Sequence, residues 1–225
     1  MPRWGNPDDD QIAMKLYYIP TTRAVRPRWL LEEMGLAYDL IRVTMELSRS
    51  DEYKALHPHG KVPVLVDETV TIFESAAICA YLADQYLDKG FAPELNSPAR
   101  AHYYQWLFYA SLTLEAPVEQ YMFHVLPGLP EKVLPQQAQV RVPPEEAKQW
   151  FAKVCEPLNT HLNDRPYLLD DQFTAADVVT GGVLLWALKL GLLKQETQVK
   201  AYIDRLMQRP AFQRADENAY ANLDL

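Results

Sequence analysis

The sequence has few cysteines, no long apolar run and no excess of positive charge, and each shortage excludes a class of protein. Only two cysteines, Cys79 and Cys155, occur among 225 residues. They are too few and too far apart for a disulfide framework or a metal-binding cluster, so we expect no metal. No run of 18 apolar residues is present, so we expect no membrane-spanning helix. A net charge of −8 argues against a nucleic-acid partner, because such proteins carry a basic face.

Residues 1–13 are polar and include Pro2, Pro7 and three consecutive aspartates. This stretch lacks the apolar segment of a secretory signal peptide. We expect a disordered extension over residues 1–13, with the folded part beginning at Met14. The cysteine usage favours a reducing, cytoplasmic environment.

The most informative stretch runs from Gly60 to Ser75. Pro63 stands directly before an apolar run and has no N–H group, so it is expected at the first residue of a strand or in a turn. Residues 64–66 and 70–73 are short apolar runs separated by a turn-sized gap, which predicts a hairpin. Ser75 precedes a helical pattern and is predicted to be its N-cap. Amide groups at such a helix start attract carboxylates.

The same reasoning divides the remaining chain into strands and helices. Before the hairpin it predicts strands over residues 15–18 and 38–43, a helix over 25–34 that ends at Gly35, and a short helix over 51–56. After residue 98 it predicts helices only, from Pro98 towards Phe123, from Pro144 to about Leu162, from Thr174, and over 199–208, the last stopped by Pro210. Thr174 and Asp177, with Phe173 and Val178 around them, predict a capping box.

This order of strand, proline, hairpin and helix resembles the glutathione site of the glutathione transferase superfamily, and the segment 173–178 is similar to the capping box of that family's helical domain. The resemblance covers roughly Met14 to Phe212. It implies an α/β thioredoxin-like domain over residues 14–87, a linker over 88–97 and an all-helical domain over 98–225. It also implies a homodimer and a role in detoxification.

The resemblance assigns the glutathione contacts residue by residue. Pro63 would be a cis-proline that presents the backbone of Val62 to the cysteinyl part of glutathione. Glu74 and Ser75 would hold the γ-glutamyl group. Lys61 or His59 would lie near the glycyl carboxylate, although a solvated lysine is the ordinary interpretation of Lys61 alone.

Activation of the glutathione thiol needs a hydrogen-bond donor and a positive field at the sulfur, because a free thiol has a pKa of about 8.5. Counted back from Arg26, Thr21 stands where serine- and threonine-type members of the family carry their activating hydroxyl, so the resemblance makes Thr21 the first candidate donor and Thr22 the second. Arg23 stands where some bacterial relatives carry cysteine or asparagine, and it is expected near glutathione. Tyr17 or Tyr18 is a further alternative, although at least one side chain of an alternating strand points into the core.

A stripe of aromatic residues in the helical part is predicted to line the pocket of the second substrate. The stripe consists of Tyr103, Trp106, Tyr109, Met122 and Phe123, with the first three expected in the pocket, and at helical spacing such a stripe also fits a core position. Arg26 and Arg28 are expected to be surface charges or partners of acidic residues on the same helix.

The function implied by the resemblance is transfer of the glutathione sulfur to a small, hydrophobic electrophile. One alternative is a glutathione-dependent disulfide reductase or peroxidase. Because neither cysteine lies near the first helix, that enzyme would use two glutathione molecules rather than a protein thiol. A second alternative is a non-catalytic binding or scaffold protein that has kept the fold.

Overall fold

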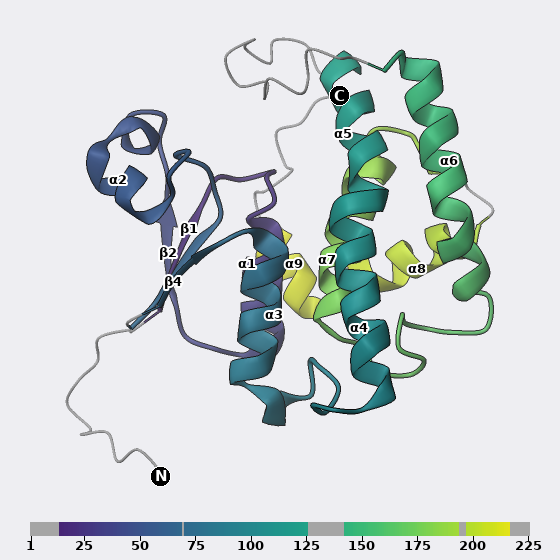
Figure 1. Cartoon of the computed structure of the whole chain (residues 1–225), viewed down its shortest axis with the longest axis horizontal. Coiled ribbons are helices and arrows are strands. Elements are labelled where there is room, and N and C mark those ends of the chain that lie inside the picture. Colours follow the sequence, from purple (N-terminus) through teal and green to yellow (C-terminus); the bar gives the residue numbers. More distant parts are fainter. Residues whose placement is uncertain (1–13, 69, 126–141, 194–196, 217–225) are drawn as a thin grey trace.

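The computed structural model describes residues 14–68, 70–125, 142–193 and 197–216. A small sheet flanked by helices is followed in the chain by a larger group of helices, and the two parts lie side by side (Figure 1). The expected extension over residues 1–13 and most of the connection between Pro127 and Pro144 lie outside the described residues.

The sheet has four strands in the order β2-β1-β3-β4. The strands are β1 (Met14–Tyr18), β2 (Asp39–Arg42), β3 (Val64–Asp67) and β4 (Val70–Phe73). β1 and β2 are parallel, whereas β3 is antiparallel to both β1 and β4. The predicted hairpin is therefore confirmed, and so is the pairing of a parallel and an antiparallel half. Paired Leu16 and Leu65 both face the main core with no exposed surface.

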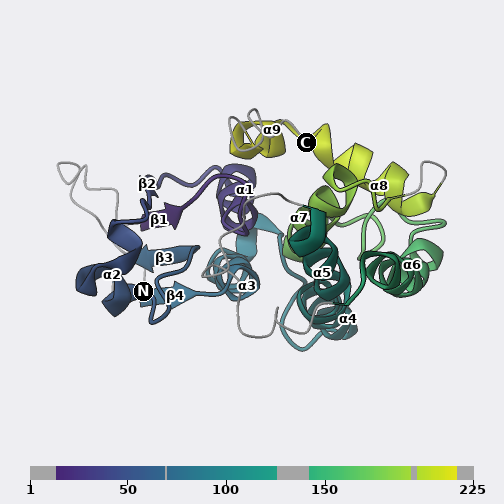
Figure 2. The ribbon, with the colours of Figure 1, turned by 90° about the horizontal axis from the view of Figure 1, so that it is seen from above.

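Helices cover both faces of this sheet (Figure 2). α1 (Val25–Met34) and α3 (Ser75–Gln85) pack on the face that looks towards the helical part. α2 (Asp51–Leu56) packs on the other face over a small cluster of Val43, Tyr53 and Val64. Gly35 ends α1 with a φ of 62°, as predicted, because a glycine adopts this left-handed conformation without a Cβ clash. Short 3-10 turns occur at Leu47–Arg49 and Leu87–Lys89.

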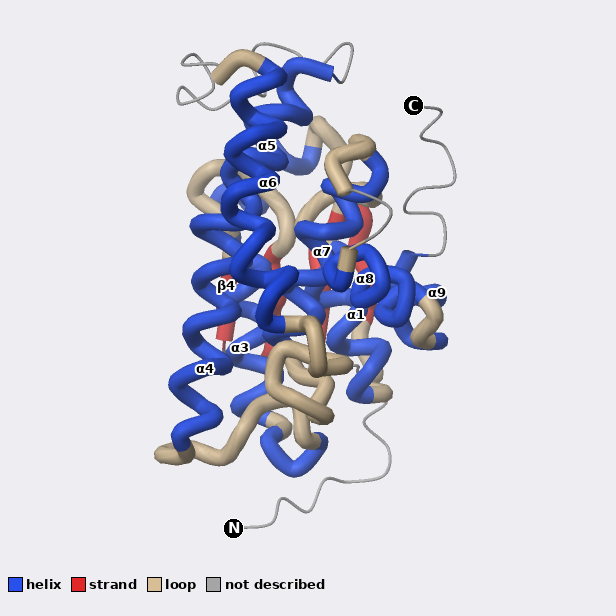
Figure 3. Tube along the Cα trace, turned by 90° about the vertical axis from the view of Figure 1, so that its right-hand side faces the viewer, coloured by secondary structure: helices blue, strands red, loops and turns tan. Residues whose placement is uncertain are grey.

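In the described residues of the second part the named elements are all helices, joined by loops (Figure 3). Its elements are α4 (Pro98–Phe108), the π-helical segment η3 (Tyr109–Leu114), α5 (Glu115–Val125), α6 (Pro144–His161), α7 (Ala175–Lys189), α8 (Gln198–Met207) and α9 (Pro210–Asp216). The first three form one continuous helix. The sequence prediction missed α9 because it used Pro210 as a stop, whereas a proline is also accepted in the first turn of a helix. Where the domains begin and end stays a prediction.

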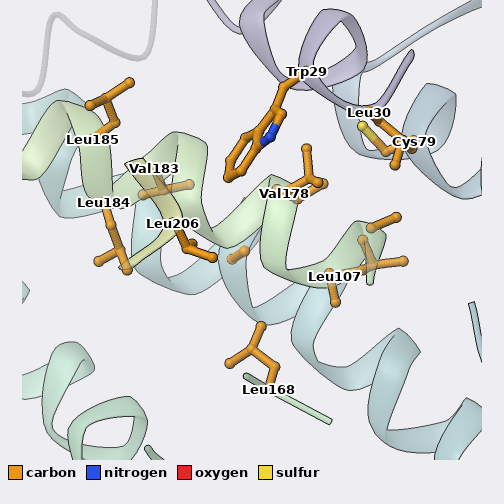
Figure 4. Packing of buried hydrophobic residues seen from close by; sticks show 14 of the residues in the cluster. Trp29, Leu30, Cys79, Leu107, Leu168, Val178, Val183, Leu184, Leu185 and Leu206 are labelled. Atoms are coloured by element: carbon orange, nitrogen blue, oxygen red, sulfur yellow. The ribbon is translucent and has the colours of Figure 1, made fainter. Parts of the chain in front are cut away.

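One hydrophobic core joins the two parts around α7 (Figure 4). Trp29 of α1 lies directly against this helix. A Cβ built on Gly181 would stand 2.8 Å from Leu206 and 3.0 Å from Trp29, so only glycine permits this close approach. The sheet domain therefore cannot move on the helical part without opening the core.

The predicted capping box at the start of α7 is confirmed. The Asp177 carboxylate accepts from the Thr174 amide at 2.8 Å, the Leu168 amide at 2.9 Å and the Tyr202 hydroxyl at 2.8 Å. Asp177 has no exposed surface, and burial raises its pKa to about 6 although these hydrogen bonds oppose the rise. The box fixes the start of the central helix.

Among the described residues, no helix combines the length and the apolar composition that crossing a bilayer requires.

Candidate active site

The turn before α1 carries the two threonines that were predicted to activate a thiol. Thr21 has a φ of 65°, in the left-handed region. The Thr22 hydroxyl donates to the Ile19 carbonyl at 2.7 Å and accepts from the Ala24 amide at 3.3 Å, so it holds the turn together. Within the described residues no hydrogen bond engages the Thr21 hydroxyl, which is left for a ligand. The ranking of Thr21 before Thr22 stays a prediction, and this difference supports it.

The amides at the start of α1 are already in use. Val25 N–H donates to the Thr22 carbonyl and Arg26 N–H to the Arg23 carbonyl, each at 3.2 Å. Neither of these two amides is therefore open to a thiolate. α1 still contributes the positive end of its dipole, and the hydroxyl of Thr21 is the remaining donor.

The start of α3 is different, because no side chain caps it. The N-cap is Glu74, whose φ is 75°, and α3 begins at Ser75. The prediction that Ser75 is the N-cap is wrong, because its Oγ instead accepts a hydrogen bond from Nη1 of Arg26 at 3.2 Å. The first amides of α3 are thus left for an external acceptor such as a carboxylate.

The loop that enters β3 contains a cis peptide bond between Val62 and Pro63, as the resemblance predicted. A hydrogen bond and a close backbone approach hold this loop. The Tyr53 hydroxyl donates to the Lys61 carbonyl at 2.8 Å, and a Cβ on Gly60 would meet the Ser48 carbonyl oxygen at 2.2 Å. The Lys61 side chain is exposed beside this loop. Val62 and Pro63 thus lie directly before β3, an inner strand of the sheet.

His57, a few residues before Val62 in the chain, was not singled out by the sequence analysis. Its side chain is buried, and the centroid of its ring is 4.6 Å from that of Phe73. The His59 amide contacts Nδ1 of His57 at 3.2 Å. Burial and the neighbouring His59 lower the pKa of His57, which favours the neutral ring at physiological pH. His57 therefore supports the loop rather than supplying a charge.

An ion cluster joins α1 and the turn before it to α5, with Arg26 and Glu115 buried and Arg23 and Glu119 partly exposed. Nε of Arg23 contacts Oε1 of Glu115 at 2.6 Å, and Nη1 of Arg26 contacts Oε2 of the same carboxylate at 3.0 Å. Arg23 also pairs with Glu119. Burial opposes ionisation of Glu115, but the attraction of Arg26 and Arg23 outweighs it and lowers the pKa of Glu115. The positive charge of Arg23 is thus largely compensated by carboxylates.

The position of Arg26 corrects the sequence analysis. Arg26 is 1% exposed, so it is neither a surface charge nor a partner of acidic residues on its own helix. Its guanidinium carbon lies 5.6 Å from the ring centroid of Trp186, and that of Arg23 lies 5.4 Å from the same ring. Spacing carries a signal for this burial, because Arg26 shares one face of α1 with Trp29 and Leu30.

The predicted aromatic pocket is not assembled at Tyr103 and Trp106. These side chains are 0% and 5% exposed and belong to the hydrophobic core, which is the alternative that their helical spacing allowed. Tyr109 is half-buried and its hydroxyl donates to the Val154 carbonyl at 2.6 Å. Of the three, only Tyr109 keeps exposed surface that a second substrate could contact.

Neither cysteine supplies a reactive thiol. Burial raises the pKa of Cys79 and of Cys155 to about 12, so both thiols stay protonated at neutral pH. Cys155 lines a cavity of about 310 Å³ between α6 and residues 192–193. The described residues contain no group of three or more potential metal ligands.

Comparison with known proteins gives the family. Residues 12–84 match the model of the glutathione S-transferase N-terminal domain, and residues 124–210 match that of the C-terminal domain. Glutathione S-transferase GstA of Escherichia coli O157:H7 is 30% identical over 207 residues, which cover 90% of this chain and 96% of that protein. Glutathione S-transferase 3 of Zea mays is 32% identical over 216 residues, covering 89% and 92%.

Solved structures agree with this result. A glutathione transferase family member from Pseudomonas fluorescens Pf-5, solved with two glutathione molecules bound, superposes with a TM-score of 0.76 at 25% identity and covers 94% of this chain and 95% of its own. The four-stranded sheet, the helical second part and the two matched domains therefore place this chain in the glutathione S-transferase family.

Proposed function

We propose that this protein is an active glutathione transferase that uses Thr21 to activate the glutathione thiol. One observation carries the proposal. The turn with the unengaged Thr21 hydroxyl and the uncapped start of α3 are held side by side by the hydrogen bond from Arg26 to Ser75. A donor for a sulfur atom and a site for a carboxylate thus occur at neighbouring helix starts.

The bound tripeptide would lie across the turn before α1, the loop that enters β3 and the start of α3. Its γ-glutamyl carboxylate would accept from the Ser75 hydroxyl and the first amides of α3, and its amino group would face the exposed carboxylate of Glu74. The cysteinyl part would pair with the backbone of Val62, and the glycyl carboxylate would lie near Lys61. The family member from Pseudomonas fluorescens with bound glutathione supports this assignment to the ligand.

The chemistry requires a thiolate. The thiol proton leaves to solvent, the sulfur attacks an electrophilic centre of a small hydrophobic substrate, and the new bond to sulfur forms as the leaving group departs. Lowering the thiol pKa by two units needs about 2.7 kcal/mol of preferential stabilisation of the thiolate. One charge-assisted hydrogen bond from Thr21, with the dipole of α1, supplies about that amount.

Replacement of Glu74 tests the binding part of the proposal. Glu74→Ala removes the counter-charge of the γ-glutamyl amino group and is expected to raise the dissociation constant of glutathione by about 10-fold or more. Glu94→Ala, at another exposed glutamate, is the matched control and should leave the dissociation constant unchanged. Unchanged affinity in a folded Glu74→Ala variant, measured by calorimetry, would contradict the assignment.

We also propose that the protein is a cytoplasmic homodimer with a role in detoxification. An apolar stripe on α4 and η3 supports the dimer, because Tyr104, Phe108 and Leu112 follow each other at four-residue intervals and are 39%, 63% and 71% exposed. Phe108→Glu is expected to shift the protein from dimer to monomer in light scattering. A wild-type protein that is monomeric at micromolar concentration would contradict the dimer.

A glutathione-dependent disulfide reductase is a second candidate, because the Pseudomonas fluorescens relative holds two glutathione molecules. The protonated thiols of Cys79 and Cys155 leave the second glutathione as the only resolving thiol for such a reaction. Faster turnover of a small disulfide than of an aryl halide would favour this candidate. A protein that binds no glutathione would support a scaffold instead.

A further inference from the structure

A chain of buried contacts runs from the helical part of the molecule to the first residue of α3. Oε2 of Glu115 accepts from Nη1 of Arg26 at 3.0 Å, and the same nitrogen contacts Oγ of Ser75 at 3.2 Å. Glu115, Arg26 and Ser75 are 3%, 1% and 3% exposed. The chain therefore links three side chains that solvent hardly reaches.

The chemistry of these groups fixes which atoms donate and which accept in the buried contacts. A guanidinium group only donates hydrogen bonds, so Oγ of Ser75 is the acceptor in its contact with Arg26. The Ser75 hydroxyl proton then points away from Arg26 and is left to donate elsewhere. Without this contact the hydroxyl could rotate and donate back into the protein.

We propose that Arg26, held by Glu115, is a positioning residue that aims the Ser75 hydroxyl proton at the γ-glutamyl carboxylate of glutathione. This inference rests on the proposed function, because it deepens the same glutathione site. Arg26 acts through Ser75, because its Nη1 is engaged by Oε2 of Glu115 at 3.0 Å and by Oγ of Ser75 at 3.2 Å. Its charge is matched by Glu115, so its contribution is orientation rather than attraction of the carboxylate.

Packing against α7 holds the Arg26 side chain in one position. A Cβ added to Gly182 would stand 2.7 Å from Cγ and 2.8 Å from Nε of Arg26, so α7 packs its bare backbone against the arginine stem. The Trp186 ring lies 5.6 Å from the guanidinium carbon. The second oxygen of Glu115 is held by Arg23, which fixes the carboxylate as well. This packing pre-organises the direction of the Ser75 hydroxyl before any ligand arrives.

A double-mutant cycle tests the proposal. Dissociation constants for glutathione are measured by calorimetry for the wild type, Ser75→Ala, Arg26→Met and the double variant. Ser75→Ala is expected to weaken binding by about 10-fold, and Arg26→Met by about the same factor. Because Arg26 acts through Ser75, the double variant should be no weaker than Ser75→Ala alone. Losses that multiply in the double variant would overturn the proposal.

A truncated ligand separates positioning from a general structural role. The analogue carries 4-aminobutyrate in place of the γ-glutamyl residue, so it lacks only the α-carboxylate. Arg26→Met should weaken binding of glutathione and leave binding of this analogue unchanged. An equal loss for both ligands would show that Arg26 merely supports the fold and would overturn the proposal. A wild-type protein that binds no glutathione would overturn the proposed function together with the inference.

Two further variants keep the test decisive if Arg26→Met does not fold. Arg26→Lys retains a cationic donor and should bind glutathione better than Arg26→Met. Gly182→Ala leaves the chemistry of Arg26 unchanged but displaces it, whereas the neighbouring Gly181→Ala strains Leu206 and Trp29 instead. Gly182→Ala is expected to raise the dissociation constant several-fold, with Gly181→Ala as the control for instability. Equal affinities of these two variants for glutathione would contradict the role of Arg26.

Discussion

Glu115 and Glu119 allow a direct comparison of a buried and a partly exposed carboxylate that bind the same arginine. Both pair with Arg23, but only Glu115 also contacts Arg26, which is 1% exposed. Glu115→Gln leaves the Arg26 charge buried without a counter-charge, and removing one partner of a buried pair costs about 3–5 kcal/mol. The Glu119 side chain is 28% exposed, and such pairs contribute about 0–1 kcal/mol.

The assay is urea unfolding at fixed protein concentration, with calorimetric melting as a second measurement. For a chain of this size, 1 kcal/mol lowers the melting temperature by about 2–4 °C. Glu115→Gln is therefore expected to lower it by roughly 6–20 °C, and Glu119→Gln by about 4 °C at most. The double variant Glu115→Leu/Arg26→Met should recover much of the loss, because it leaves no unpaired charge. Equal losses for the two single variants would refute the reasoning.

Three other predictions follow from the same contacts. The pKa of Glu115 lies below its ordinary value of 4.5 in the folded chain, so its contribution to stability is present above that value and is lost as the pH falls through the lower folded pKa. The difference in unfolding free energy between wild type and Glu115→Gln should accordingly shrink as the pH falls from 5 to 3, and a constant difference would contradict this. Thr21→Ala should raise the pKa of the bound thiol by about 1–2 units in a titration, whereas Thr22→Ala should mainly lower the unfolding free energy by about 1 kcal/mol in urea. A larger rise of the thiol pKa in Thr22→Ala than in Thr21→Ala would contradict the ranking. Asp177→Ala leaves the Tyr202 hydroxyl and two amides without their acceptor and should cost about 3 kcal/mol or more in urea unfolding, so a loss under about 1 kcal/mol would count against the capping box as the anchor of α7.

Local patterns predicted the elements well where the determining residues are neighbours in the chain. The hairpin of β3 and β4, the end of α1 at Gly35, and the capping box of Thr174 and Asp177 all depend on residues within a few positions of each other. Turn geometry and capping are set by such short-range contacts, so they can be predicted from the sequence. The predictions of these elements were confirmed for that reason.

The ion cluster could not be predicted in the same way, because its members are brought together only by the packing of α1 against the helical part. Glu115 lies 89 positions from Arg26 in the chain, and an arginine beside glutamates on a helix ordinarily points to solvent. The same long-range packing took the hydroxyl of Ser75 away from helix capping. It also turned Tyr103 and Trp106 into core residues, since amphipathic spacing does not tell a core face from a pocket wall.

Titration of the glutathione thiol on the protein tests the central claim most directly. The ultraviolet absorbance of the thiolate is followed against pH for glutathione bound to the purified wild-type chain, with free glutathione beside it and Thr21→Ala as the comparison. The account predicts a bound thiol pKa well below that of the free thiol, and a return towards the free value in Thr21→Ala. Bound glutathione that titrates with the same pKa as free glutathione would contradict the claim that this site activates the thiol.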